Sequence, residues 1–165
     1  MKLNNLINVG MGQLYVSSNE DVYFETLVGS CIALFLYDKT KNLAGIAHVM
    51  LPTNPDGKKT FDPMNAGKYA DEALESLIAR LISRGGKLEN ITAKLVGGAN
   101  LFSHESGKSY IGIGEKNTKF IKLLLHEKKI PIISEDLGGH YGRKILFEVK
   151  TGKAICKKQK EEIVL

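Results

Sequence analysis

The sequence predicts an α+β fold, a layered α/β sandwich with mixed or antiparallel sheets and two main helices. Several short apolar segments with the length of strands surround two segments in which apolar residues recur at helical spacing. No repeat, low-complexity tract or Pro/Ser-rich linker divides the 165 residues, so we expect a single domain spanning residues 1–165. Hydrophobic residues at 43% and charged residues at 25% are the balance of an ordinary globular protein.

The first third of the chain is predicted to form strands. Residues 9–16 and 22–27 are expected to be a pair of strands around the polar turn 17–20. Residues 32–37 are a short, continuous apolar run beside a glycine, which indicates a buried strand. Another apolar run covers residues 44–51, and the turn between these runs predicts a hairpin.

Two helices and further strands follow. Apolar residues recur at helical spacing over 73–82, and a Gly-Gly pair then stops the helix. A strand is predicted at 91–96, and a second helix is expected to start near Asn117 and to end at a proline. Residues 144–149 and 154–157 flank a Thr-Gly-Lys turn and predict a closing hairpin.

Composition excludes several classes of protein. The sequence has no apolar run of the roughly 20 residues that a membrane helix needs and no signal-peptide pattern, so we expect a cytoplasmic protein without membrane insertion. The net charge of +5 comes with lysines gathered in the last third but not interleaved with aromatics, which favours a solvated face over a nucleic-acid site. That face would also suit an acidic protein partner.

The residues that favour chemistry are Cys31 and His48. Cys31 follows Gly29-Ser30 where a turn enters the first strand of the predicted hairpin, and His48 lies on its second strand. Antiparallel pairing would bring the thiol and the imidazole close together, as a cysteine nucleophile and its base require. Such activation would lower the thiol pKa below its ordinary value of about 8.5. Cys156 has no histidine nearby in sequence and is expected to be structural.

Three alternatives remain open at this level. A lone cysteine or histidine beside aliphatic residues is commonly a packed core residue. Cys31, His48, His104 and His140 could converge on a metal ion, although no pair has the short spacing of a zinc site. The chain could also be a non-catalytic adaptor that binds through its basic face. The glycine-rich segments at 97–100, 112–114 and 138–139 lack the phosphate-loop signature and predict sharp turns.

The ordered set of motifs resembles the CheD family of chemoreceptor glutamine deamidases over nearly the whole chain. The matching segments are Val9-Gly10-Met11-Gly12-Gln13, Thr26-Leu27-Val28-Gly29-Ser30-Cys31, Gly45-Ile46-Ala47-His48-Val49-Met50-Leu51-Pro52, Lys68-Tyr69-Ala70-Asp71, Val96-Gly97-Gly98-Ala99, Ile113-Gly114-Glu115-Lys116-Asn117, Glu135-Asp136-Leu137-Gly138-Gly139, Gly142-Arg143 and Thr151-Gly152. The resemblance implies a sandwich similar to bacterial toxin deamidases, with Cys31 as nucleophile, His48 as base and an upstream threonine that orients the histidine.

The resemblance also implies a protein-glutamine glutaminase without cofactor or metal. Its substrates would be glutamine side chains of methyl-accepting chemotaxis receptors, and a chemotaxis phosphatase of the CheC type would be a regulatory partner. Thr26 fits the orienting position, but some relatives have the threonine one residue earlier, where this chain has Glu25. Neighbouring strand residues point to opposite faces, so only one can reach His48, and an uncharged hydroxyl favours Thr26.

Overall fold

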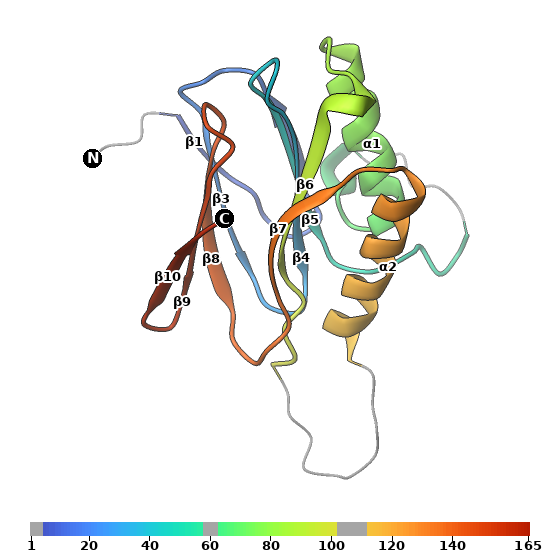
Figure 1. Ribbon diagram of the computed structural model, residues 1–165. Helices are drawn as coiled ribbons and strands as arrows, with labels where there is room; N and C mark the ends of the chain where they lie inside the picture. Colours follow the sequence, from blue (N-terminus) through green and yellow to red (C-terminus); the bar gives the residue numbers. More distant parts are fainter. Residues whose placement is uncertain (1–4, 58–62, 102–111) are drawn as a thin grey trace, which may run out of the picture.

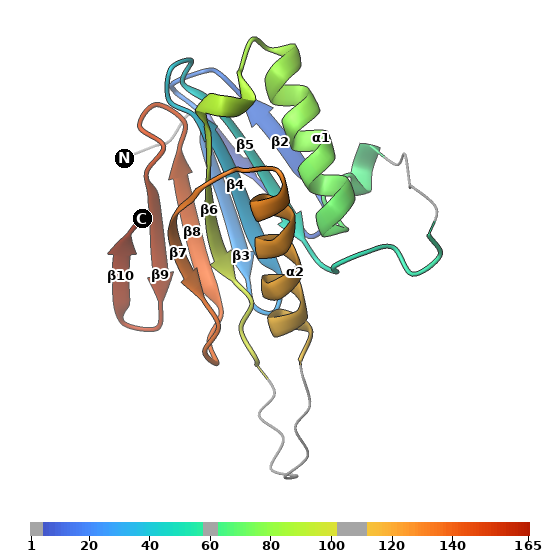
Figure 2. The same ribbon diagram turned by 45° about the vertical axis from the view of Figure 1, so that its right-hand side comes forward.

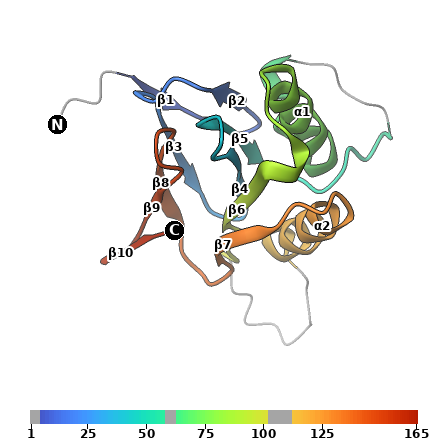
Figure 3. The ribbon, with the colours of Figure 1, turned by 45° about the horizontal axis from the view of Figure 1, so that its top comes forward.

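The computed structural model describes residues 5–57, 63–101 and 112–165. Two five-stranded sheets lie face to face, and two α-helices cover the far side of one of them, giving three layers (Figures 1 and 3). This arrangement confirms the predicted α+β fold with two main helices.

The first strands alternate between the two sheets, and the last three all belong to the outer sheet. The strands and helices are β1 (Leu6–Asn8), β2 (Leu14–Ser17), β3 (Tyr23–Val28), β4 (Ile32–Asp38), β5 (Leu43–Val49), α1 (Ala70–Ser83), β6 (Ile91–Gly97), α2 (Ile113–Glu127), β7 (Ile132–Leu137), β8 (Arg143–Glu148), β9 (Ala154–Lys158) and β10 (Glu161–Val164), with short 3₁₀ turns at Pro63–Asn65 and Leu88–Asn90.

Both sheets are mixed. The outer sheet has the order β1-β3-β8-β9-β10, and the central sheet has the order β2-β5-β4-β6-β7. One pair in each sheet, β1 with β3 and β6 with β7, is parallel, and the other pairs are antiparallel. Helix α2 makes the crossover between β6 and β7, as Figure 2 shows.

The predicted hairpin, β4 with β5, lies at the middle of the molecule. Every residue of both strands is buried, because one face packs on the helices and the other packs on the outer sheet. On β4, Leu34 belongs to the core beneath the helices, and Phe35 belongs to the core between the sheets, where its ring stacks on Phe147. Burial on both faces explains the continuous apolar run in the sequence.

The first helix packs closely on the central sheet. Its buried residues Ala73, Leu74, Leu77 and Leu81 follow the spacing that predicted the helix. A Cβ at Gly45 on β5 would lie 2.7 Å from Leu77 Cδ2, so a larger residue there would require the Leu77 side chain to move. Neither described helix is long and apolar enough to cross a bilayer.

The N-terminal strands differ from the prediction. The segment 9–16 does not form one strand, because the chain turns at Gly12 (φ +76°), where the Gln13 side chain accepts a hydrogen bond from the Gly10 N–H. The strand that follows this turn, β2, does not pair with β3 either. It pairs with β5 in the central sheet, whereas β3 belongs to the outer sheet.

Other boundaries also depart from the sequence pattern. Helix α2 begins at Ile113, one turn before the expected start, and three strands, β1, β7 and β10, were not predicted. The burial pattern of β10 is mostly exposed, so its sequence has little apolar signal. The closing hairpin β8–β9 is confirmed, with Gly152 in its turn at φ +70°.

Candidate active site

Cys31 lies in the turn that leaves the outer sheet at the end of β3 and enters β4 of the central sheet. Its side chain is partly buried against the core between the sheets. The end of β6 supports the turn from behind: Ala99 N–H donates to the Gly29 carbonyl and Gly98 N–H to the Cys31 carbonyl, both at 2.9 Å. Gly97 has φ +122°, and a Cβ there would lie 2.2 Å from the Cys31 oxygen, so only glycine permits this close approach.

His48 lies on β5 with its side chain between the two sheets and only 3% exposed. Its partner in the β4–β5 ladder is Ala33, and Cys31 comes two residues before Ala33. In a regular antiparallel ladder, residues in this diagonal relation lie about 7–8 Å apart on one face, and Cys31 stands one residue before the ladder begins at Ile32. The register therefore places both residues at the same end of the space between the sheets.

Thr26 reaches His48 from the opposite sheet. Its Oγ1 lies 3.0 Å from His48 Nδ1 and donates to the Val9 carbonyl at 2.7 Å. A threonine hydroxyl has one hydrogen, and Val9 takes it, so the oxygen accepts from the Nδ1–H of the imidazole. The neutral His48 then carries its lone pair on Nε2, the nitrogen that is free to accept a proton.

Glu25 points away from this group. Its carboxylate pairs with Lys144 Nζ at 2.9 Å on the other face of the outer sheet. A shallow groove of about 330 Å³ lies where the two faces meet, lined by Asn8, Val9, Gly10, Glu25, Thr26, Leu27 and Lys144. Of the two candidates for the orienting residue, the structure places Thr26 against His48 and Glu25 on the surface.

Burial keeps both members of the pair neutral. Desolvation lowers the pKa of His48 below its ordinary value of 6.5, although the hydrogen bond with the Val9 carbonyl opposes this shift. Desolvation likewise raises the pKa of the Cys31 thiol above 9.0. The expected lowering of the thiol pKa is therefore wrong for the free protein, because a neutral imidazole supplies no positive charge to stabilise a thiolate.

Cys156 has the surroundings of an inert thiol. It is fully buried, and burial together with the nearby carboxylate of Asp136 raises its pKa to about 11. That carboxylate, on β7, also accepts from Arg143 Nε at 3.0 Å and pairs with Lys158 Nζ at 3.1 Å, both on the outer sheet. Cys156 thus belongs to a charged cluster that joins the two sheets.

The metal-site and adaptor alternatives concern the histidines and the basic face. No group of three His, Cys, Asp or Glu side chains in the described segments could hold a metal ion, and His104 lies outside them. Several lysines of the basic face are paired: Lys144 with Glu25, Lys150 with Glu20 and Lys157 with Glu162.

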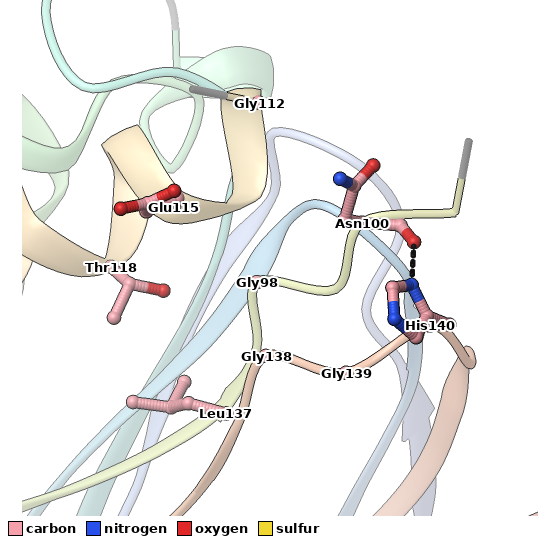
Figure 4. A pocket seen from close by; sticks show the side chains of 9 residues that line it. All are labelled: Gly98, Asn100, Gly112, Glu115, Thr118, Leu137, Gly138, Gly139 and His140. Atoms are coloured by element: carbon pink, nitrogen blue, oxygen red, sulfur yellow. Dashed lines mark hydrogen bonds between the residues drawn. The ribbon is translucent and has the colours of Figure 1, made fainter. Parts of the chain in front are cut away.

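The glycine-rich turns do meet around a second pocket of about 390 Å³, next to the first turn of α2 (Figure 4). Its polar groups include Glu115, Thr118 and His140, whose Nδ1 lies 3.0 Å from the Asn100 carbonyl. The residues that line it in the described part of the chain include no lysine or arginine. A carboxylate without a cation is unsuited to phosphate, which agrees with the interpretation of these glycines as turns.

Two contributors were missed by sequence reasoning. The Val9 carbonyl takes the Thr26 hydrogen, and Asn117 on α2 donates to the Ser30 carbonyl beside Cys31. Every residue has a backbone carbonyl, so the sequence gives no signal that the one at Val9 contributes to the site. Asn117, however, stands four residues before Ile121 and eight before Leu125, on the buried face of the helix, and a polar residue there was a detectable signal.

Comparison with known proteins supports the sequence resemblance. A family model described as CheD chemotactic sensory transduction matches residues 50–158. A chemoreceptor glutamine deamidase CheD of Halalkalibacterium halodurans is 40% identical over 149 residues, which cover 90% of this chain and 91% of that protein. A probable chemoreceptor glutamine deamidase CheD of Clostridium botulinum strain Hall is 36% identical over 151 residues, 92% of this chain and 91% of the relative.

Among solved structures, the crystal structure of the Bacillus licheniformis hypothetical protein YfiH is similar to this one with a TM-score of 0.47. The similarity has 16% sequence identity and covers 75% of this chain and 50% of that chain.

Proposed function

The chain belongs to the CheD family, and from that premise we propose that it hydrolyses glutamine side chains of chemoreceptors to glutamate, with Cys31 as nucleophile and His48 as general base. The observation that carries the proposal is the contact of Thr26 with His48, which leaves Nε2 as the basic nitrogen of the imidazole.

The reaction starts from a neutral thiol and a neutral imidazole. Nε2 of His48 takes the Cys31 proton as the sulfur attacks the side-chain amide carbon, which forms a C–S bond and an oxyanion. The imidazolium then gives its proton to the departing nitrogen, the C–N bond breaks, and ammonia leaves a thioester. Water attacks the thioester with His48 again as base, which gives glutamate and the free thiol.

The turn at Cys31 is suited to hold the oxyanion. Its carbonyls at Gly29, Ser30 and Cys31 all accept hydrogen bonds from behind, from β6 and α2. None of the turn, loop or side-chain hydrogen bonds among the described residues is donated by the N–H of Ser30 or Cys31. In a trans peptide the N–H points opposite to the carbonyl, so the Ser30 and Cys31 N–H groups point away from β6 and α2, and we propose them as the donors to the developing negative charge.

The proposal is tested on a receptor cytoplasmic fragment that contains its glutamines. Incubation with the protein should release ammonia and convert particular glutamines to glutamates, which peptide mass mapping locates. Regulation by a CheC-type phosphatase, which the family resemblance suggests, is tested by adding that partner to the same assay. Absence of any amide-to-acid conversion in a folded sample would contradict the proposed activity.

A further inference from the structure

Asn117 is a fully buried polar residue of α2 that contacts both sides of the active site. Its Nδ2 lies 3.2 Å from the Ser30 carbonyl and 3.0 Å from the Met50 carbonyl. Carbonyl oxygens only accept hydrogen bonds, so the atom that faces both is the amide nitrogen, with one hydrogen for each. One side chain thus joins the turn of Cys31 to the residue two positions after His48.

The bond to Ser30 fixes the direction of one particular N–H group. The Ser30 carbonyl belongs to the same peptide unit as the Cys31 N–H, and in a trans peptide these groups point in opposite directions. Holding the carbonyl toward α2 therefore holds the Cys31 N–H toward the opposite side. The carbonyls of Gly29 and Cys31 are held by backbone donors, whereas that of Ser30 depends on a side chain.

The oxygen of the Asn117 side-chain amide shows that packing alone does not explain why an asparagine occupies this position. Its Oδ1 is buried and has no hydrogen-bond partner among the described residues. The next two residues on this face, Ile121 and Leu125, are apolar and equally buried. A buried acceptor without a partner is unfavourable, so keeping an amide here has to be explained by its two donated bonds.

We infer that Asn117 is a positioning residue that orients the Cys31 N–H as an oxyanion donor and sets the distance between the nucleophile turn and the strand of His48. This inference rests on the proposed function. It predicts that the amide matters to the tetrahedral intermediate more than to the binding of the receptor or to the thiol itself.

The test is the variant Asn117→Leu, which keeps the size of the side chain and removes both donors. Turnover of a receptor fragment should fall about 10- to 100-fold in kcat, somewhat less than the effect of deleting an oxyanion donor itself. KM should change by no more than about twofold, because the amide does not touch the receptor. Alkylation of Cys31 by iodoacetamide forms no oxyanion, so its rate should also stay within about twofold.

Leu125→Ala is the matched control, since it removes a buried side chain from the same helix face two turns further on. It should lower the melting temperature and leave kcat unchanged below the melting transition. A loss of kcat in Asn117→Leu no larger than in Leu125→Ala at equal folded fraction would overturn the inference. If Cys31→Ala abolishes turnover in the same assay, that result would leave the proposed nucleophile standing.

Asn117→Asp gives a second readout if the leucine variant does not fold. An ionised carboxylate has no hydrogen to donate, but a protonated one has an O–H that can bind the Ser30 carbonyl. The ratio of its kcat to that of the wild type should therefore rise as the pH is lowered toward the pKa of the new carboxyl. A ratio that does not change with pH would contradict the inference, and so would failure of both variants to fold.

Discussion

The hydroxyl of Thr26, on the outer sheet, lies 3.0 Å from Nδ1 of His48, on the central sheet. This contact crosses the core between the sheets and determines which imidazole nitrogen carries hydrogen, because Thr26 has already given its own hydrogen to the Val9 carbonyl. The tautomer of the proposed base therefore depends on correct packing of the two sheets.

Removing the hydroxyl should weaken the base without abolishing it. In Thr26→Val the Val9 carbonyl, 3.4 Å from Nδ1, can still accept the imidazole hydrogen. We expect kcat to fall on the order of 10-fold, below the 10²- to 10⁴-fold that general acid–base catalysis contributes. The measurement is ammonia release from a receptor fragment at matched folded fraction.

Glu25→Gln is the control for Thr26→Val, because it alters the adjacent residue on the opposite face of β3. Its kcat should stay within about twofold of the wild type, since an ion pair whose lysine is exposed contributes little. If the glutamine variant loses more activity than the valine variant, Thr26 does not orient His48.

The two pKa shifts predict how reactivity depends on pH. Because the pKa of Cys31 is raised above 9.0, the thiolate is scarce at neutral pH, and alkylation by iodoacetamide should speed up about tenfold per pH unit toward that value. Because the pKa of His48 is lowered below 6.5, the base is already neutral at pH 6.5, and deamidation should lose activity only at lower pH. Alkylation samples quenched at successive times and initial rates of deamidation, both taken from pH 5 to 10, measure these two dependences.

A thiolate that titrates below pH 7 would show instead that Cys31 and His48 form an ion pair at rest. In that case alkylation would be fast and nearly independent of pH across the neutral range. Under the proposed mechanism, digestion of the alkylated protein should show the label on Cys31 before it appears on Cys156. Burial and the Asp136 carboxylate raise the pKa of Cys156 to about 11, so its thiol reacts more slowly.

The fold was predictable where local pattern and tertiary packing agree. The β4–β5 hairpin and α1 are buried along the apolar residues that predicted them. Strand β7 was missed because Ser134, Glu135 and Asp136 give it a polar sequence, although Asp136 is held between the sheets by Arg143. The pairing of β2 with β5 was missed because nothing local specifies a partner 30 residues away.

The site was predictable to a similar extent. The hairpin register places Cys31 and His48 at the same end of the β4–β5 pair, and strand alternation separates Thr26 from Glu25. Alternation does not tell which face of β3 meets the central sheet, since that depends on how the two sheets pack on each other. The burial that keeps the thiol neutral likewise follows from the packing of the two sheets, which no motif encodes.

The charged cluster between the sheets should matter to stability. Arg143 is 4% exposed, and its guanidinium bonds Asp136 as well as the carbonyls of Gly138 and Tyr141. Arg143→Met leaves the buried carboxylate with Lys158 and should lower the free energy of unfolding by about 3 kcal/mol. Urea denaturation of the variant and the wild type measures the difference.

Lys144→Met, at the next position of β8, is the control for that loss. Lys144 is 57% exposed and pairs only at the surface, so this change should cost less than about 1 kcal/mol. Equal losses in the two variants would mean that the buried position of the Arg143–Asp136 pair has no special effect.

The proposed mechanism depends most on Cys31 as the nucleophile. The most direct measurement is ammonia release from a receptor cytoplasmic fragment by Cys31→Ala and Cys156→Ala, with both variants shown to be folded by thermal melting. Cys31→Ala should lose activity by about 10³-fold or more, to the background of the assay, because the thioester route needs its sulfur. Cys156→Ala should retain activity close to that of the wild type. Undiminished turnover in Cys31→Ala would contradict the mechanism proposed for this chain.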